Sequence, residues 1–224
     1  MRICKQCIQP DTRPNIYFND EGICGACLWE EEIKSIDWNS RRKELQGIAD
    51  WAKNNTKSNY DCVIGVSGGK DSTFQAITAR DELGLRCLLV NGEPEGITNI
   101  GRYNIENLKK LGFDVISLRP NPKITKKLVK YDFYKHGNPF KATEFSLWAS
   151  AYIIADNFDI PLIIQGENAA LTLGVSKGDL SKNYNALEAN KQNTQALGWK
   201  EYLDVDDVEE KDFIAIIGPN GAGK

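Results

Sequence analysis

The chain has 224 residues and a formal net charge of −3 at pH 7, with 28 Lys and Arg residues against 31 Asp and Glu residues. Its 41% hydrophobic and 26% charged residues exclude a collagen, a coiled coil or a disordered chain. The negative charge argues against nucleic acid as the main partner. No apolar run approaches the roughly 20 residues of a membrane span, and residues 1–30 lack the apolar core of a signal peptide. We therefore expect a cytoplasmic protein.

Two Cys-x-x-Cys pairs mark the first 30 residues, which we expect to form a zinc-knuckle module. The pairs are Cys4 with Cys7 and Cys24 with Cys27, and sixteen residues separate them. This spacing is typical of a four-thiolate zinc site. Such a site leaves no position open for water, so we expect the zinc to be structural. An iron–sulfur cluster is the alternative, and disulfides are not expected in a reducing compartment.

Residues 31–59 are predicted to be a helical connector and a linker. We expect one helix over about residues 28–53, followed by the polar linker 54–59. Hydrophobic residues within the connector are the candidate buried positions: Ile33, Ile36, Leu45, Ile48, Ala49 and Trp51.

Strand-like and helix-like segments alternate through the main domain, which we place at residues 60–205. This pattern predicts an α/β fold with a parallel sheet and right-handed crossovers. Strands are expected at 62–66, 86–90, 114–118 and 162–165, and helices at 72–83, 99–111, 124–135 and 143–158. We expect the helix over 143–158 to be well buried, and Cys62 and Cys87 to be small buried hydrophobes. The helix over 99–111 has five candidate buried residues: Ile100, Tyr103, Ile105, Leu108 and Leu111.

A glycine-rich turn, Ser67-Gly68-Gly69-Lys70-Asp71-Ser72, follows the first predicted strand. Glycines let the backbone approach a ligand closely, and the N–H groups at a helix start attract anions. Asp71 can hold Mg²⁺, and Ser72 and Thr73 can cap the helix while donating hydrogen bonds. The spacing excludes the G-x-x-x-x-G-K-[ST] P-loop. A turn that only packs a helix onto a strand is the alternative.

Polar residues follow two further predicted strands, at 91–93 and 166–168. Ligands of parallel α/β sheets bind beyond the carboxyl ends of the strands, so we expect these groups to converge with the glycine-rich turn. Ordinary loop composition would also place polar residues there.

The glycine-rich turn resembles the SGGxDS signature of the ATP-pyrophosphatase (PP-loop) superfamily, whose members split ATP between the α and β phosphates. Further segments narrow this resemblance from the superfamily to one family. They are the two cysteine pairs, Pro-Asp-Thr-Arg-Pro at 10–14, and the segments 18–27, 137–144 and 166–168. Over residues 1–205 the chain resembles the N-acetyl sugar amidotransferase family, which serves acetamidino-sugar synthesis for surface polysaccharide or flagellin glycans. The resemblance implies an adenine nucleotide α-hydrolase-like domain.

The resemblance implies that ATP adenylates the acetamido oxygen of an N-acetyl sugar, which we expect to be nucleotide-linked, and that ammonia then displaces AMP. It implies Mg²⁺ bound through Asp71, and Lys70 and Ser72 as the other catalytic residues. The pyrophosphate would contact Ser67, Gly68, Gly69, Ser72 and Thr73. The adenine would lie against the backbone of Val90 and Asn91, with Gly166 and Glu167 forming the opposite wall.

The nitrogen source is predicted from the cysteine and histidine content. A glutaminase needs a cysteine nucleophile with a histidine base. Here four cysteines are assigned to metal, Cys62 and Cys87 are expected to be buried, and His136, the only histidine, is expected in a loop. We therefore expect a separate glutaminase subunit to supply ammonia, and the resemblance adds a synthase-type companion.

Two segments have no assigned role. The predicted helix over 123–135 is rich in lysine, which suits a solvated face or a patch for the phosphates of a nucleotide-linked sugar or of RNA. Residues 206–224 end in Gly218-Pro219-Asn220-Gly221-Ala222-Gly223-Lys224, which resembles an incomplete Walker A sequence of ABC-type ATPases. We expect this tail to be a truncated or junction sequence.

Two other functions fit parts of the sequence. A PP-loop tRNA-modifying enzyme, such as a thiolase with zinc knuckles, also adenylates a carbonyl, but the negative charge and the lack of a catalytic cysteine beside the cleft argue against it. A non-catalytic scaffold that binds zinc and a nucleotide is the second alternative.

Overall fold

The computed structural model describes residues 1–12, 16–166, 202 and 205. The chain divides into two compact units, residues 1–43 with 167–195 and residues 44–166 with 196–224, and each is described by itself. The boundaries predicted after residues 30 and 59 stay predictions, and the predicted tail 206–224 lies outside the described residues. Within the described part of the chain, no helix has the length and apolar character needed to cross a membrane.

The described part of the first unit packs around cysteine side chains. Two isolated antiparallel bridges, Ile3 with Pro10 and Phe18 with Cys24, shape the loops before helix α1 (Gly25–Glu32). One buried cluster consists of Cys4, Cys24 and Cys27, with partly buried Ile16, Phe18, Ile23 and Ala26 packed against them. Trp29 of α1 is also buried, with 9% of its surface exposed. A core this small depends on the cysteines rather than on buried aliphatic side chains.

The predicted single connector helix is wrong. The chain forms α1, a short 3₁₀ helix (Ile33–Ser35) and α2 (Trp38–Asn55), with an extended residue, Ile36, between the last two. Asp37 explains the break, because its carboxylate accepts hydrogen bonds from the N–H groups of Asn39 and Ser40 at 3.0 and 3.1 Å. Such a side chain starts a new helix rather than continuing an old one.

Helix α2 buries small residues instead of the large ones that were predicted. Ala49 is 1% exposed, as predicted, and Ala52 is fully buried. The other predicted core positions are half-buried or exposed: Ile33 and Ile36 are half-buried, and Leu45, Ile48 and Trp51 are exposed. The alanine face permits close packing on the neighbouring helices, and it directs the bulky side chains elsewhere.

The second unit contains a sheet of four parallel strands, which confirms the predicted α/β class. The strands are β1 (Cys62–Gly65), β2 (Cys87–Gly92), β3 (Asp114–Leu118) and β4 (Leu162–Ile164), in the order β3-β2-β1-β4. Strand β2 starts one residue later than predicted and runs to Gly92, and β4 ends one residue before its predicted end. The strand order reverses at β1, which lies between β2 and β4, and ligands bind at such switch points.

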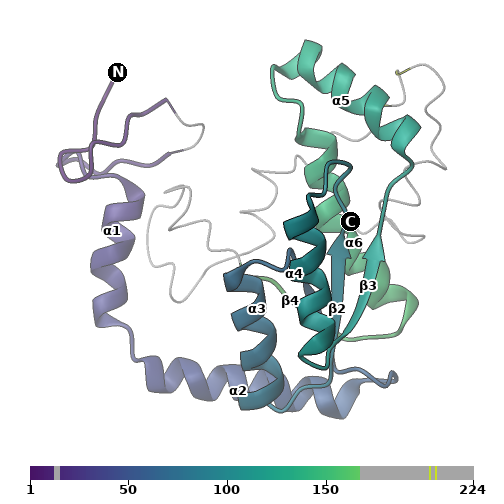
Figure 1. The fold of residues 1–224 in the computed structure, drawn as a ribbon. Helices are drawn as coiled ribbons and strands as arrows, with labels where there is room; N and C mark the ends of the chain where they lie inside the picture. The colour runs from purple at the N-terminus through teal and green to yellow at the C-terminus, as the bar shows by residue number, and fades with distance from the viewer. Residues whose placement is uncertain (13–15, 167–201, 203–204, 206–224) are drawn as a thin grey trace. The chain divides into compact units, whose positions relative to one another are not determined.

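Helices cover both faces of this sheet (Figure 1). One face packs on α2, on α3 (Lys70–Ile77) with a following π-helical turn (Thr78–Glu82), and on α4 (Asn99–Lys110). The other face packs on α6 (Lys141–Asn157). Alternate strand residues supply the two cores, as the two-residue period of a strand requires: Cys62, Ile64 and Leu89 face α3 and α4, and Val63, Leu88 and Val90 face α6.

Two helices bury less apolar surface than predicted. On α4, Ile105 and Leu108 are buried as predicted, but Ile100, Tyr103 and Leu111 are exposed. On α6, Ala151, Ile154 and Ala155 are buried, whereas Leu147 and Tyr152 are exposed. A helix that lies on one face of a sheet buries only the stripe that touches it.

Helix α5 (Pro122–His136) begins at the N-cap Asn121 and ends at Gly137, which adopts a left-handed conformation with φ of 66°. His136, predicted in a loop, is the last residue of this helix. The buried carboxylate of Asp132 joins α5 to α6 and to Tyr202, because it accepts hydrogen bonds from the Ala142 N–H at 2.8 Å and the Tyr202 hydroxyl at 2.7 Å.

Candidate nucleotide and metal sites

The glycine-rich turn lies between β1 and α3, at the carboxyl end of the strand where the sheet order reverses. Gly68 has φ of +76°, and a Cβ atom placed on it would lie 2.9 Å from Asn104 Cβ and 3.0 Å from the Asn104 carbonyl carbon. Gly69 has an ordinary φ of −71°, and its Cβ would meet only Ser67 Oγ at 3.3 Å. Packing against α4 therefore explains Gly68 but not Gly69.

Helix α3 begins at Lys70, two residues earlier than predicted, with Gly69 at the N-cap position. Ser72 and Thr73 are therefore not caps, which corrects the prediction. The Ser72 hydroxyl donates to the Gly69 carbonyl at 3.2 Å, and the Thr73 N–H donates to the same oxygen at 3.0 Å. The Thr73 bond is the first hydrogen bond between backbone groups of α3. The N–H groups of residues 70–72 therefore have no acceptor within the helix. This end of α3 suits an anion.

Two charged side chains stand at the same helix start. The Lys70 ammonium lies 2.7 Å from Asp71 Oδ1, and the two side chains are 87% and 89% exposed. An ion pair that is so exposed contributes only about 0–1 kcal/mol. A divalent cation can therefore displace the lysine from the carboxylate, and an exposed aspartate beside a helix start that suits an anion is a suitable oxygen ligand for Mg²⁺.

The ends of β2 and β4 lie close to this loop. Gly166 follows β4, and a Cβ on it would lie 3.1 Å from Gln75 Oε1 of α3. The Val90 carbonyl accepts a hydrogen bond from the Val66 N–H at 2.8 Å, next to the loop. Asn91 is 4% exposed, and its Nδ2 lies 3.5 Å from Ser117 Oγ of β3. Contact of Val90 and Asn91 with adenine stays a prediction, and Glu167 lies outside the described residues.

One residue that shapes the loop, Asn104, was not predicted from the sequence. Asn104 lies mid-helix on α4, and no pattern in the sequence distinguishes it from a solvent-facing residue. The one indication in the sequence is Gly68 itself, because a glycine allows another segment to pack closely against the backbone at that position. A groove of about 390 Å³ between α3 and α4 borders Gly68 and Thr73, so the loop is also accessible from the α4 side.

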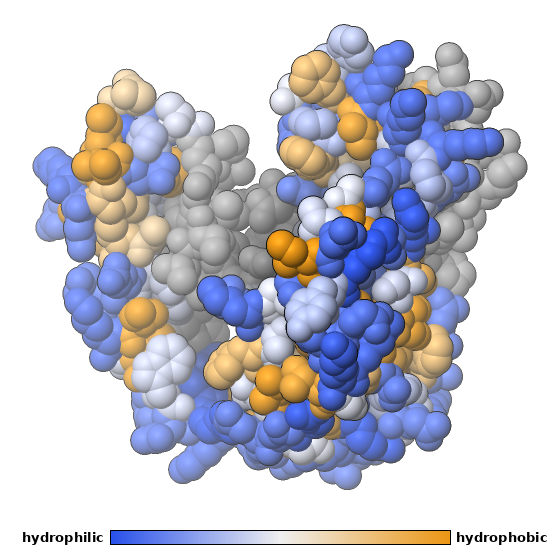
Figure 2. All heavy atoms as spheres, in the orientation of Figure 1, coloured by the Kyte–Doolittle hydropathy of each residue, from blue (hydrophilic) through white to orange (hydrophobic). Residues whose placement is uncertain are grey.

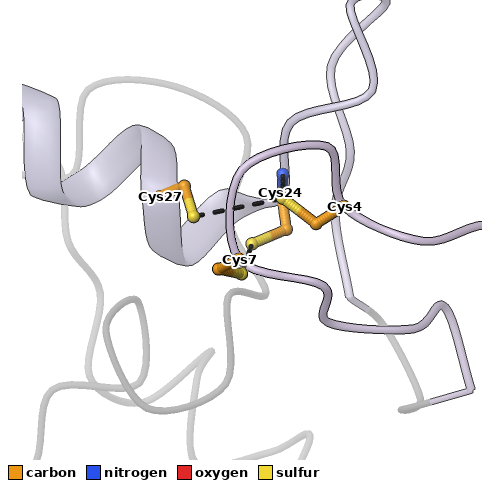
Figure 3. Close-up of side chains that lie close together, drawn as sticks. All are labelled: Cys4, Cys7, Cys24 and Cys27. Carbon is orange, nitrogen blue, oxygen red and sulfur yellow. Dashed lines mark hydrogen bonds between the residues drawn. The ribbon is translucent and has the colours of Figure 1, made fainter.

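The four cysteines of the first unit converge on one point (Figure 3). Their sulfur atoms all lie within 4.8 Å of one another, with Cys4 to Cys27 at 4.0 Å and Cys7 to Cys24 at 3.5 Å. A tetrahedron with metal–sulfur bonds of about 2.3 Å has sulfur–sulfur edges of about 3.8 Å. The cluster therefore fits a single tetrahedral ion and could bind zinc.

Hydrogen bonds and burial set the ionisation of these thiols. Burial acts to raise the pKa of Cys4, but N–H groups of Cys24, Cys7 and Gln6 lower it to about 6. The Cys4 sulfur accepts from the Gln6 and Cys24 amides at 3.4 and 3.3 Å. Burial raises the pKa values of Cys24 and Cys27. The Cys4 thiolate therefore forms readily, and a bound cation would favour the thiolate forms of Cys24 and Cys27 against the effect of their burial.

No protein-family model matches the chain, and no curated protein matches it. Many solved structures are similar to it, and three of them illustrate the similarity. They are an NMN synthetase from Francisella tularensis (16% identity, TM-score 0.39, 57% of this chain and 55% of that one), an NH3-dependent NAD synthetase from Campylobacter jejuni subsp. jejuni NCTC 11168 in complex with the nitrate ion (15%, 0.46, 74% and 76%), and a predicted subunit of tRNA methyltransferase from Methanocaldococcus jannaschii DSM (18%, 0.36, 60% and 63%). The chain spans 55% and 63% of the length of the first and third. Because all three TM-scores are below 0.5, we base the proposals below on this chain's own residues.

Proposed function

We propose that this protein is an ATP-pyrophosphatase-type enzyme that adenylates the acetamido group of an N-acetyl sugar and replaces its oxygen with nitrogen from ammonia. The observation that carries the proposal is the glycine-rich loop between β1 and α3, at the point where the strand order reverses. The SGGxDS sequence of this loop supports cleavage of ATP between the α and β phosphates. The choice of an N-acetyl sugar rests on the family resemblance of residues 1–205.

The chain's own groups suit positioning and charge stabilisation. The N–H groups at residues 70–72 and the loop backbone at Gly69 would donate to the pyrophosphate as it leaves. Asp71 would hold the Mg²⁺, which neutralises phosphate charge when bound. Lys70, released from Asp71, would then stabilise the charge that develops on the α-phosphate. Ser72 is placed with its hydroxyl at the Gly69 carbonyl, where it fixes the first turn.

The nitrogen would come from a partner glutaminase subunit with its synthase-type companion. Cys62 and Cys87 support this, because they are 0% and 7% exposed and their sulfur atoms lie 3.6 Å apart inside the sheet. His136 lies with Nε2 3.2 Å from the Lys141 ammonium rather than beside a cysteine. None of the described cysteines has the exposure and histidine base that a glutaminase nucleophile requires.

The products of ATP cleavage test this proposal directly. The protein is incubated with ATP, Mg²⁺, an ammonium salt and a panel of free and nucleotide-linked N-acetyl sugars, and the products are resolved by anion-exchange chromatography and mass spectrometry. We expect AMP, pyrophosphate and an amidino sugar in equal amounts. These products should form when ammonium is the nitrogen source and not when glutamine replaces it. ADP as the product, or unaided hydrolysis of glutamine, contradicts the proposal. AMP formation in a parallel incubation with tRNA in place of the sugars, and not with the sugars, supports the tRNA-modifying alternative.

A further inference from the structure

A cluster of one carboxylate and two guanidinium groups lies at the carboxyl edge of the sheet, outside the glycine-rich loop. Glu93 follows β2, and its N–H donates to the Leu118 carbonyl at the end of β3 at 2.8 Å. Arg102 from α4 and Arg119 after β3 approach the same oxygen, Glu93 Oε1, at 3.5 and 3.7 Å. Three separate segments therefore place their charges at one point.

The geometry of this cluster differs from that of a structural ion pair in the same chain. Arg86 binds Asp61 through two nitrogens at distances down to 2.6 Å. In the cluster, the contacts of 3.5 and 3.7 Å are longer than a charged hydrogen bond. The Glu93 side chain is only 17% exposed, whereas those of Arg102 and Arg119 are 54% and 46% exposed. The carboxylate anchors the cluster, and the guanidinium N–H groups face solvent.

The charge of the cluster leaves it able to bind an anion. One carboxylate neutralises one of the two guanidinium groups, so the three side chains together carry a net charge of +1. Arg102 lies in the first turn of α4, which contains no acidic residue, so the positive end of the helix dipole adds to this charge. Guanidinium groups bind phosphate through two parallel hydrogen bonds, and an adjacent pair of them selects it strongly.

Helix α4 contributes one residue to the cluster and another to the packing of the glycine-rich loop. Arg102 lies two positions before Asn104 along the helix, with only Tyr103 between them, and Asn104 contacts the loop at Gly68. Arg119, however, follows β3, the edge strand beyond β2, whereas the loop follows β1. An anion held by the two arginines therefore lies at the same edge of the sheet as the loop, two strands away from it. The face in view in Figure 2 is mostly hydrophilic over α4, which suits a polar ligand.

We propose that Arg102 and Arg119, positioned by Glu93, bind a phosphate group of the second substrate, which makes the acceptor a phosphate-bearing acetamido sugar rather than a free one. This inference rests on the proposed function, since that function supplies the acetamido group. It goes beyond it in naming the residues that bind the phosphate of the acceptor. Glu93 is a positioning residue, and the two arginines are binding residues.

Substitution of the arginines tests the inference by two independent measurements. Arg102→Gln, Arg119→Gln and the matched control Lys109→Gln, which removes one exposed positive charge from α4, are titrated calorimetrically with UDP-N-acetylglucosamine, N-acetylglucosamine and ATP. We expect each arginine variant to bind UDP-N-acetylglucosamine at least about tenfold more weakly, as the loss of a charged hydrogen bond implies. The Kd of the arginine variants for ATP should stay within twofold of that of the unmodified protein. All Kd values of the Lys109→Gln control should do the same. Glu93→Gln should weaken UDP-N-acetylglucosamine less than either arginine variant and leave ATP unchanged.

Three outcomes overturn the inference. One is that the unmodified protein binds N-acetylglucosamine as tightly as its UDP-linked form, or binds neither. Another is that the arginine variants bind UDP-N-acetylglucosamine normally. The third is that they lose ATP to the same degree, which would assign both arginines to the phosphates of ATP. Formation of AMP by the unmodified protein is measured separately, so failure of the proposed function is recognised independently of these titrations.

Discussion

At the scale of single residues, Gly68 and Gly69 are neighbours with different requirements. Gly68 combines a positive φ with a backbone neighbour only 3.0 Å from the site of a Cβ, so any side chain there must move α4. Gly69 has an ordinary φ, and its one close neighbour is a hydroxyl that can rotate. The fold therefore requires glycine at position 68. It does not require glycine at position 69, where the absence of a side chain would instead let a ligand approach the backbone.

We predict that Gly68→Ala lowers the free energy of unfolding by about 1–3 kcal/mol, because it strains the backbone and overpacks the contact with Asn104. Gly69→Ala, the matched control, should unfold within about 0.5 kcal/mol of the unmodified protein. Urea denaturation followed by circular dichroism measures both. Under the proposed function, Gly69→Ala should nevertheless slow AMP formation, since its methyl group faces the bound phosphates. Equal stability of the two variants would contradict this account of Gly68.

Asp71 is exposed and contributes little to the fold, so its role can be tested without loss of structure. We predict that Asp71→Asn lowers the rate of AMP formation by about 10²-fold or more, as the removal of one charged group in a phosphoryl site does. Its unfolding curve should not change. Asp50→Asn, another exposed aspartate beside a lysine, is the control and should keep full activity. A fully active Asp71→Asn variant would remove the Mg²⁺ assignment.

At the scale of elements, one ion pair ties the starts of β1 and β2 together. Asp61 is 1% exposed, and its carboxylate accepts from the Arg86 backbone N–H at 2.8 Å as well as from the guanidinium. Burial acts to raise the pKa of Asp61, but the hydrogen bonds from Arg86 outweigh it and hold the pKa below its ordinary value. The pair therefore fixes the register of the two central strands at the edge opposite the candidate site.

This pair predicts a pH-dependent stability. Because the pKa of Asp61 is lower in the folded state, its contribution is present above the unfolded pKa of about 3.9 and is lost as the pH falls through the folded value. Asp61→Asn should lower the free energy of unfolding by about 1–3 kcal/mol at pH 7, and the difference should shrink below about pH 4. Urea denaturation from pH 3 to pH 7 measures it. A difference that stays constant across this range would show that the charge contributes nothing.

At the scale of the whole molecule, the two units have different sources of stability. Among its described residues, the second unit has a hydrophobic core on each face of the sheet and a smaller cluster of Leu128, Ala142 and Tyr202. The described part of the first unit has a core of cysteines with a few partly buried neighbours. We therefore expect a metal ion to contribute most of the stability of the first unit.

We predict one tightly bound zinc per chain, and selective unfolding of residues 1–30 when a strong chelator removes it. Hydrogen exchange read by mass spectrometry should show lost protection in α1 and the preceding loops, with protection of β1 and β2 retained. Zinc added back should restore the pattern, which controls for damage by the chelator. Iron with visible absorbance in the purified protein, or unchanged exchange after complete metal removal, would refute the structural zinc.

The sequence by itself determined the features that depend on local patterns. Alternation of strands and helices predicted the parallel sheet, and the spacing of Cys4, Cys7, Cys24 and Cys27 predicted their convergence on one point. The burial of Cys62 and Cys87 also followed from the apolar segments around them. The glycine-rich turn was located correctly because glycines between a strand and a helix form a local signal. The roles of its residues in binding ATP stay predictions.

Only the tertiary structure decided which side of each helix is buried and which distant residues meet. Leu45, Ile48 and Trp51 are apolar at helical spacing, yet α2 packs through Ala49 and Ala52 instead. Asn104 meets Gly68, and Arg102 meets Arg119 at Glu93, because the strand order brings α4, β2 and β3 together at one edge. Such contacts join residues that are far apart in the chain or on different elements, and hydrophobic periodicity carries no information about them.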